Sequence, residues 1–150
     1  EASPMQLELE PDEVKAAAGL AGRLTFTGRL DHRYAPEAIA AVDALAVPST
    51  EEEAFGMVAA EAAAAGTLPV VARQSALAEV AAALEAAIGR PGALSFEPGP
   101  GATRRLAERL GALLDESAAA RERLTAAARA HVANEWTWER TAERLLDAAS

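Results

Sequence analysis

Short apolar runs with β-strand character alternate with alanine-rich runs of helical pattern along most of the chain. We expect strands at 5–9, 23–28, 43–49, 68–72 and 93–97. We expect helices to begin near Pro11, to cover 35–42, 55–65 and 75–89, and to fill the chain after Gly101. Strands that are apolar on both sides are typical of a parallel sheet covered by helices on both faces. The alternation therefore predicts an α/β fold with a parallel sheet and a helical C-terminal segment.

Composition excludes several classes of protein. The 150 residues are enough for one ordinary domain, which we expect to span 1–150. The chain has no cysteine, which excludes disulfides, thiol catalysis and zinc-thiolate sites. The net charge of −9 argues against a general nucleic-acid binder, and the apolar runs are too short to span a bilayer. We expect a cytoplasmic protein without a membrane span and without a nucleic-acid partner.

The segment PSTEEEAFGMVAAEAAAAG, residues 48–66, has an unusual distribution of acidic residues. Three consecutive glutamates, 51–53, precede an alanine-rich helix that carries one further carboxylate, Glu61. The three acids could simply interact favourably with the helix dipole, by about 0.3–1 kcal/mol each. Glu61 could equally be a solvated side chain. Charge runs usually are solvated, so the sequence pattern by itself favours this interpretation.

A binding interpretation of the same segment rests on helix geometry. Ligands of parallel sheets bind beyond the carboxyl ends of the strands, and this segment follows a predicted strand. A helix that starts near Phe55 would leave the N–H groups of Phe55, Gly56 and Met57 free at its mouth. Glu61 would lean back toward that mouth, which Glu53 borders. Donor groups beside two carboxylates suit a ligand with phosphate and several hydroxyls, such as a sugar nucleotide.

The longer stretch PSTEEEAFGMVAAEAAAAGTLPVVA resembles the signature of group 1 glycosyltransferases. These are retaining enzymes of the GT-B architecture that use nucleotide-diphosphate sugars. Their hallmark is two glutamates separated by seven residues, the first two positions before a Phe-Gly pair, as Glu53 and Glu61 are here. GLAGRLTFTGRL upstream and RQSALAEV and WTWERTAERLL downstream resemble further family segments, in order, over about residues 5–149. The resemblance implies a Rossmann-like sheet, the donor-binding C-terminal half of such an enzyme.

The resemblance also implies roles for individual residues. Glu61 would accept hydrogen bonds from the ribose hydroxyls of the nucleotide. Glu53 would contact the donor sugar near its reacting face and is the candidate catalytic residue. The backbone amides of Phe55, Gly56 and Met57 would bind donor-sugar oxygens or the diphosphate, whose developing charge the helix dipole would stabilise.

Further positions complete the expected donor site. Gly28, Arg29 and Leu30 would lie beside the base of the nucleotide. Arg73 is the best candidate to replace part of the family's diphosphate-binding Arg and Lys pair, although a lone loop arginine is more often a solvated group. Neither His32, expected in an exposed turn, nor His131, expected to be structural, has a second ligand at metal spacing. We expect no metal and no cofactor, with the nucleotide-diphosphate sugar as donor substrate.

The chain departs from the family pattern in three ways. The family's first, central strand and the Arg and Lys that follow it are not found before Met5, and the one lysine is Lys15. Ser75 or Ala76 stands where the family usually has glycine. An N-terminal acceptor domain would not fit into 150 residues. We therefore expect a donor half cut short, inactive alone, whose sheet is completed by the rest of a longer enzyme, by a partner chain, or by MQLEL itself.

Two functions from different classes remain. The leading interpretation is a donor domain that binds a nucleotide-diphosphate sugar for retaining glycosyl transfer. The alternative is a non-catalytic binding or assembly module derived from the same fold, which the missing Arg and Lys favour. A dinucleotide-binding Rossmann domain is the least favoured, because the chain has no Gly-x-Gly-x-x-Gly fingerprint.

Overall fold

The computed structural model describes residues 19–20, 22–25, 27 and 30–149 of the chain. The chain divides into two units, Glu1–Asp31 and His32–Ser150. In the first unit the described residues include a turn in which the Arg23 N–H donates to the Leu20 carbonyl at 2.8 Å. The expected strand at 5–9 and the helix near Pro11 lie outside the described residues.

The expected strand at 23–28 is wrong for the part of it that the structure describes. Residues 23–25 and 27 form no strand, and Leu24 is 48% exposed. A run of Leu, Thr and Phe has strand propensity, but propensity becomes a strand only when a neighbouring strand pairs with it.

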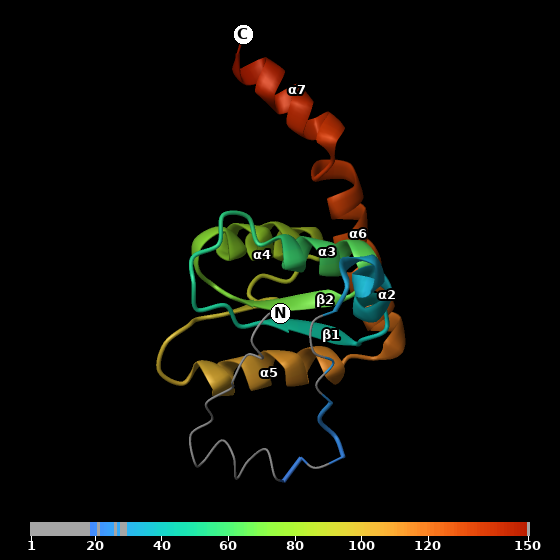
Figure 1. Ribbon diagram of the computed structural model, residues 1–150, viewed down its shortest axis with the longest axis vertical. Helices are drawn as coiled ribbons and strands as arrows, with labels where there is room; N and C mark the ends of the chain where they lie inside the picture. Colours follow the sequence, from blue (N-terminus) through green and yellow to red (C-terminus); the bar gives the residue numbers. More distant parts are fainter. Residues whose placement is uncertain (1–18, 21, 26, 28–29, 150) are drawn as a thin grey trace. The chain divides into compact units, whose positions relative to one another are not determined.

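The second unit contains a three-stranded parallel sheet in the order β1-β2-β3 (Figure 1). The strands are β1 (Ala44–Val47), β2 (Leu68–Ala72) and β3 (Ser95–Phe96). Ala44 pairs with Leu68 and Val71 pairs with Ser95, which sets the register of the two ladders. The structure confirms the strand expected at 68–72 with the same bounds, and those expected at 43–49 and 93–97 with shorter bounds. The chain has the α/β, Rossmann-like fold that the sequence predicts.

Helices cover both faces of this sheet. α3 (Met57–Ala65) and α4 (Ser75–Ala87) lie on one face and α5 (Ala102–Leu114) on the other, while α6 (Ala118–Glu135) packs across α3 and α4. The 3-10 helix η1 (His32–Tyr34) leads into α2 (Ala35–Ala40), which packs beside α3. The last helix is α7 (Trp138–Ala148). The predicted helical pattern is confirmed, including the stop of α3 at Gly66, which has φ +93°.

The core lies between the central strand and the helices above it. All five residues of β2 are buried, because β2 has a strand on each side and a helix layer on each face. Leu77 and Leu84 of α4 and Ala59 of α3 are fully buried against it. The alanines of α3 matter here, since a small side chain lets the helix backbone lie close to the sheet.

The outer edge of β1 differs from the rest of the sheet. Among the described residues, β1 pairs with β2 alone, and all four of its residues keep some exposure. An edge of this kind presents unpaired backbone groups to any chain that can pair with it. The absence of a central strand remains a prediction, because residues 1–18 lie outside the described part of the chain.

α7 has a different character from the other long helices. None of its residues is buried, and Trp138 is 86% exposed. The Thr137 hydroxyl caps the helix by accepting from the Arg140 N–H at 3.2 Å, and Arg144 forms an ion pair with Glu135 of α6 at 2.9 Å. None of the described helices, α7 included, has the length and apolarity needed to cross a membrane.

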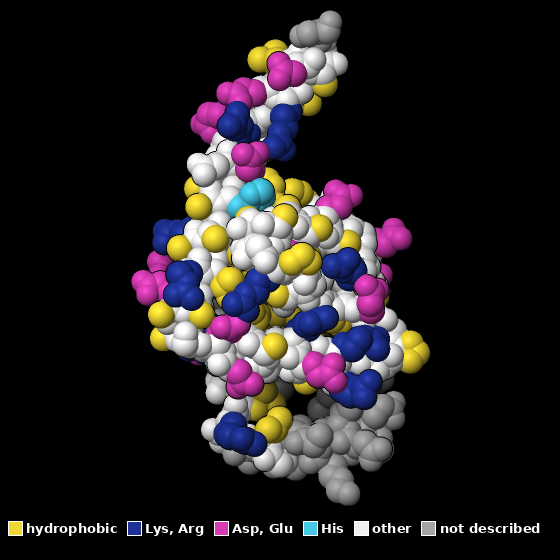
Figure 2. Space-filling view, turned by 180° about the vertical axis from the view of Figure 1, so that it is seen from behind, with side chains coloured by type: hydrophobic (Ala, Val, Ile, Leu, Met, Phe, Trp, Pro, Cys, Tyr) yellow, Lys and Arg dark blue, Asp and Glu magenta, His cyan; other side chains and the backbone are white. Residues whose placement is uncertain are grey.

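On the described surface that Figure 2 shows, charged side chains are mixed rather than segregated. On the face that Figure 2 shows, acidic and basic groups are interspersed over the body of the second unit and along α7. Nucleic-acid binders instead concentrate Lys and Arg on one face.

Candidate functional site

The loops that follow the three strands meet at the carboxyl edge of the sheet, because parallel strands all end there. The loop after β1, residues 48–56, leads into α3, and residues 73–74 lead from β2 into α4. The Gln74 side-chain amide joins the two loops by donating to the carbonyls of Ser49 at 2.6 Å and Glu51 at 3.1 Å. The carboxyl edge of the sheet is thus held in one arrangement by side-chain contacts.

The helix mouth at α3 is built on a glycine. The helix begins at Met57, two residues after the expected start at Phe55. Gly56 is its N-cap residue, and the left-handed φ of +77° at Gly56 keeps the helix from extending toward Phe55. A Cβ at Gly56 would lie 2.7 Å from Leu77 Cδ2, so the close approach that this glycine permits comes from α4.

The amides of the mouth nevertheless have no partner among the described residues. The N–H groups of Phe55, Gly56 and Met57 donate to no described acceptor. Phe55 is 46% exposed and Met57 61% exposed, whereas Gly56 is buried. Free N–H groups at the start of a helix attract anions, since the helix dipole adds partial positive charge there.

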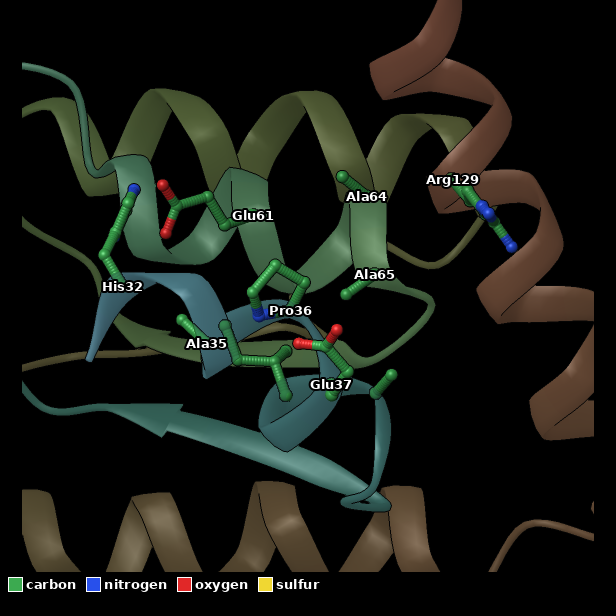
Figure 3. A pocket seen from close by; sticks show the side chains of 10 residues that line it. His32, Ala35, Pro36, Glu37, Glu61, Ala64, Ala65 and Arg129 are labelled. Carbon is green, nitrogen blue, oxygen red and sulfur yellow. The ribbon is translucent and has the colours of Figure 1, made fainter. Parts of the chain in front are cut away.

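Glu61 stands one turn further along α3. Its side chain is half-buried and makes no hydrogen bond or ion pair with any described residue. It lines a cleft of about 510 Å³ between α2 and α3, the α2–α3 cleft (Figure 3). It also lines a groove of about 900 Å³ bordered by α3, α4, α6 and α7, which we name the α3–α4 groove. A carboxylate that is half-buried without a protein partner is available to a ligand with hydroxyl groups.

The α2–α3 cleft is also lined by His32, for which the sequence predicted an exposed turn. Figure 3 shows His32, from η1, and Glu61, from α3, at the same end of this cleft. Glu37 of α2 and Arg129 of α6 also line this cleft. His32 is exposed and lies in a 3-10 turn, as expected. Its place beside this cleft could not be read from the sequence, because it depends on the packing of α2 on α3.

The α3–α4 groove combines the helix mouth with aromatic side chains. Phe55, Met57 and Glu61 all line it. The Phe55 ring meets Trp136 edge-on, with 5.9 Å between ring centroids, and Trp136 meets His131 in the same way at 5.1 Å. Trp136 thus packs against the core, as expected of an anchor, and one wall of the groove is apolar.

Glu53 lies beside this mouth but does not line either of the cavities on which Glu61 lies. It is half-buried, and its backbone is hydrogen-bonded to Ser75 and Ala76 at the start of α4. The structure therefore brings the two glutamates to the same helix without placing both carboxylates in one cavity. Their joint action on a ligand remains a prediction.

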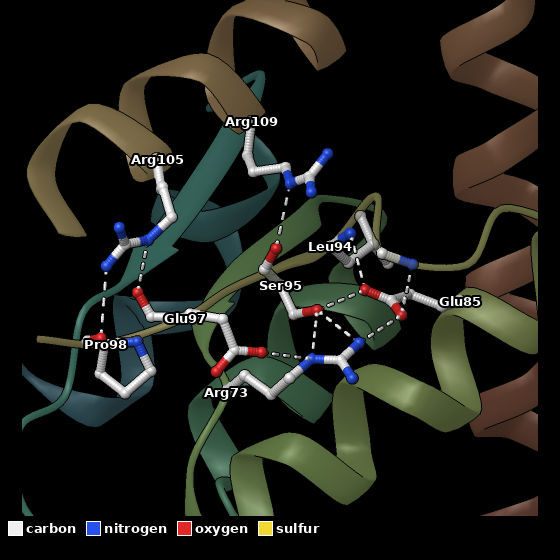
Figure 4. A network of polar contacts seen from close by, with 9 residues as sticks. Arg73, Glu85, Leu94, Ser95, Glu97, Pro98, Arg105 and Arg109 are labelled. Atoms are coloured by element: carbon white, nitrogen blue, oxygen red, sulfur yellow. Dashed lines mark hydrogen bonds and ion pairs between the residues drawn. The ribbon is translucent and has the colours of Figure 1, made fainter. Parts of the chain in front are cut away.

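Arg73 is at the carboxyl end of β2, as expected, but its guanidinium is engaged within the protein (Figure 4). Nε and Nη2 donate to Ser95 Oγ at 3.2 and 3.1 Å, and Nη2 also donates to Glu85 at 3.3 Å. A carboxylate oxygen of Glu97 lies 3.7 Å from Nε. Arg73, the candidate for part of the diphosphate-binding pair, is thus directed toward β3 and α4.

The centre of this network is Glu85, a residue that the sequence analysis did not single out. Its side chain is buried and accepts hydrogen bonds from the N–H groups of Gly92 at 2.7 Å and Leu94 at 3.0 Å, and from the Ser95 hydroxyl at 2.7 Å. A signal was present in the sequence, because Glu85 continues the buried stripe of α4 at the spacing of Leu77 and Ala81. A carboxylate on the buried stripe of a helix implies an internal set of donors.

The residues expected beside the base cannot be assigned to this site. Gly28 and Arg29 lie outside the described residues, and Leu30, which is 43% exposed, belongs to the first unit. Across the described part of the chain, no group of three His, Asp or Glu side chains is arranged to hold a metal ion.

Near the start of α3 the structure thus brings together backbone amides and the Glu61 carboxylate, which have no partner among the described residues. A family model, glycosyl transferases group 1, matches residues 8–131. The chain belongs to this family. The match ends before α7, so the resemblance of WTWERTAERLL to the family's last helix lies outside it. No curated protein and no solved structure matched the chain.

Proposed function

We propose that this chain is the donor-binding part of a retaining glycosyltransferase and that it binds a nucleotide-diphosphate sugar. Membership of the family supports glycosyl transfer in general. We propose in addition that the donor is a nucleotide-diphosphate sugar, that the transfer is retaining, and that the chain is part of a GT-B enzyme. The observation that carries it is the placement of Glu61, which is half-buried, lines two cavities and has no partner among the residues that the structure describes.

The geometry suggests how the parts of the donor are divided. The ribose hydroxyls donate to Glu61 from the α2–α3 cleft, where His32 lies at the same end. The diphosphate binds the free amides of Phe55 and Met57, because the helix mouth stabilises negative charge that grows as the diphosphate leaves. Glu53, at the same mouth, contacts the sugar. No metal or cofactor is part of this proposal.

A titration of the chain with UDP, GDP and their sugars tests the proposal. Glu61→Ala should weaken nucleotide binding by about 1–3 kcal/mol, roughly 5- to 150-fold, because a charged acceptor is lost. Glu122→Ala is the matched control, since Glu122 is exposed on α6 and lines neither cavity next to Glu61. Equal weakening by both substitutions would show a general charge effect and contradict the role of Glu61.

One observation favours the alternative, a non-catalytic binding or assembly module. The Arg73 guanidinium, which would hold the diphosphate, is bonded to Ser95 and Glu85. If wild-type protein shows no binding of UDP, GDP or their sugars at millimolar concentration, the alternative is correct and the donor proposal is wrong.

A further inference from the structure

The first residues of α4 hold the acidic loop in place. The Ser75 hydroxyl accepts from the Glu53 N–H at 3.0 Å, and the Ala76 N–H donates back to the Glu53 carbonyl at 3.3 Å. Both backbone polar groups of Glu53 are therefore bonded to the start of α4. Gln74, the residue just before α4, also donates to the carbonyls of residues 49 and 51, which fixes the chain ahead of Glu53. Glu53 is therefore the residue of the loop with the most complete backbone support.

Ser75 makes this contact from a backbone conformation that residues other than glycine rarely adopt. Its φ is +43°, and among the described residues it is the single non-glycine residue with a positive φ. Glycine adopts such a φ without steric cost but has no hydroxyl to accept the Glu53 N–H. Strained backbone persists where surrounding contacts enforce it, and it clusters at functional sites. The serine thus combines a disfavoured backbone with a hydrogen bond that glycine could not make.

We propose that Ser75, assisted by Gln74, is a positioning residue that fixes Glu53 at the mouth of α3. This inference rests on the proposed function, in which Glu53 contacts the sugar of the donor. Glu61 does not depend on Ser75, because it is carried by α3, whose own start is set by Gly56 against Leu77. Loss of the Ser75 hydroxyl therefore affects the sugar part of the donor and leaves the nucleotide part in place.

The first measurement is hydrogen exchange at the Glu53 amide. Ser75→Ala and Ser75→Gly both remove the acceptor, so the amide should exchange at least about tenfold faster in each. Ser75→Asn tolerates positive φ and offers a side-chain carbonyl as acceptor, so it should restore slow exchange. Unchanged exchange in both Ala and Gly variants would show that the hydroxyl does not hold the loop.

The second measurement is the affinity for UDP-glucose relative to UDP, or for GDP-mannose relative to GDP. Ser75→Ala should remove most of the advantage of the sugar nucleotide, while affinity for the nucleotide alone changes less than about twofold. Glu53→Ala should give the same loss, and the double variant should lose little more, because both substitutions act on one contact. A merely structural role would weaken both ligands in parallel, and that result would overturn the proposal.

Failure of the inference can be told apart from failure of the proposed function. If wild-type protein binds no sugar nucleotide, the donor proposal and the sugar role of Ser75 are both wrong, and only the exchange result decides whether Ser75 holds the loop. If wild-type protein binds the sugar nucleotide and Ser75→Ala keeps its full advantage, the donor proposal stands and the positioning role is wrong.

Discussion

Glu85 and Glu61 lie on neighbouring helices of the same face of the sheet, and their surroundings differ in kind. Glu85 is buried and accepts bonds from two backbone amides, a hydroxyl and a guanidinium. Glu61 is half-buried and has no partner among the described residues. A buried acid whose acceptor positions are filled stabilises the fold, whereas an acid left open beside a cavity can bind a ligand. The residue type and the face of the sheet are shared, so the local environment separates the two roles.

The largest effect on the free energy of unfolding should come from removing Glu85, whose carboxylate is fully hydrogen-bonded. Glu85→Ala leaves the buried Leu94 amide, the half-buried Gly92 amide and the Ser95 hydroxyl without this acceptor, so the free energy of unfolding should fall by about 3–5 kcal/mol. Urea unfolding followed by circular dichroism measures the change. Glu79→Ala, an exposed position on the same helix, is the control and should stay within about 0.5 kcal/mol. Similar values for both would contradict the distinction.

The second-largest loss of stability should come from a substitution at Gly56, which packs against Leu77 where the start of α3 meets α4. Gly56→Ala places a Cβ 2.7 Å from Leu77 Cδ2 at a φ of +77°, so it should cost about 3 kcal/mol. Gly66→Ala has a φ of +93°, and its Cβ would lie 3.7 Å from the nearest neighbour, so only the backbone cost of about 1 kcal/mol is expected. The difference in unfolding free energy between the two variants isolates the Leu77 contact. Equal losses would show that Leu77 does not restrict the backbone at the start of α3.

Arg73 should behave as part of the Glu85 network. Arg73→Ala removes one donor from Glu85 but leaves the two amides and the hydroxyl, so the loss in unfolding free energy should be about 1–2 kcal/mol. UDP affinity should change less than twofold, because the guanidinium is already engaged. A large loss of UDP affinity with little change in stability would restore Arg73 as a diphosphate ligand.

The smallest effect on stability should come from Glu61→Ala. Nothing in the described protein loses a partner, and alanine suits a helix at least as well as glutamate, so the change should stay within about 0.5 kcal/mol. Thermal unfolding without ligand measures it. A loss above about 1.5 kcal/mol would mean that Glu61 supports the fold, which would remove the basis of its ligand role.

Much of the fold of the second unit could be predicted from the sequence, because apolar runs and helical periodicity report local burial directly. The strands, the helices and the stop at Gly66 follow from such local signals. The strand expected at 23–28 was wrong in its described part, since pairing depends on a partner that propensity does not specify.

The site was only partly predictable for a related reason. Glu61, Phe55 and Met57 could be placed at one helix from their spacing alone. His32 at the same end of the cleft as Glu61, and the four donors around Glu85, depend on contacts between segments distant in sequence. The contacts of Arg73, a candidate for the diphosphate, with Ser95 and Glu85 likewise join segments distant in sequence.

The exposure of α7 has a practical consequence for optical measurements. Without any buried side chain, α7 can open locally while the sheet remains folded. Trp138 then reports the terminal helix, whereas Trp136, packed on Phe55 and His131, reports the core. Intrinsic fluorescence of the wild type should therefore superimpose two transitions, and a Trp138→Phe variant should leave the single cooperative signal of the sheet and its covering helices.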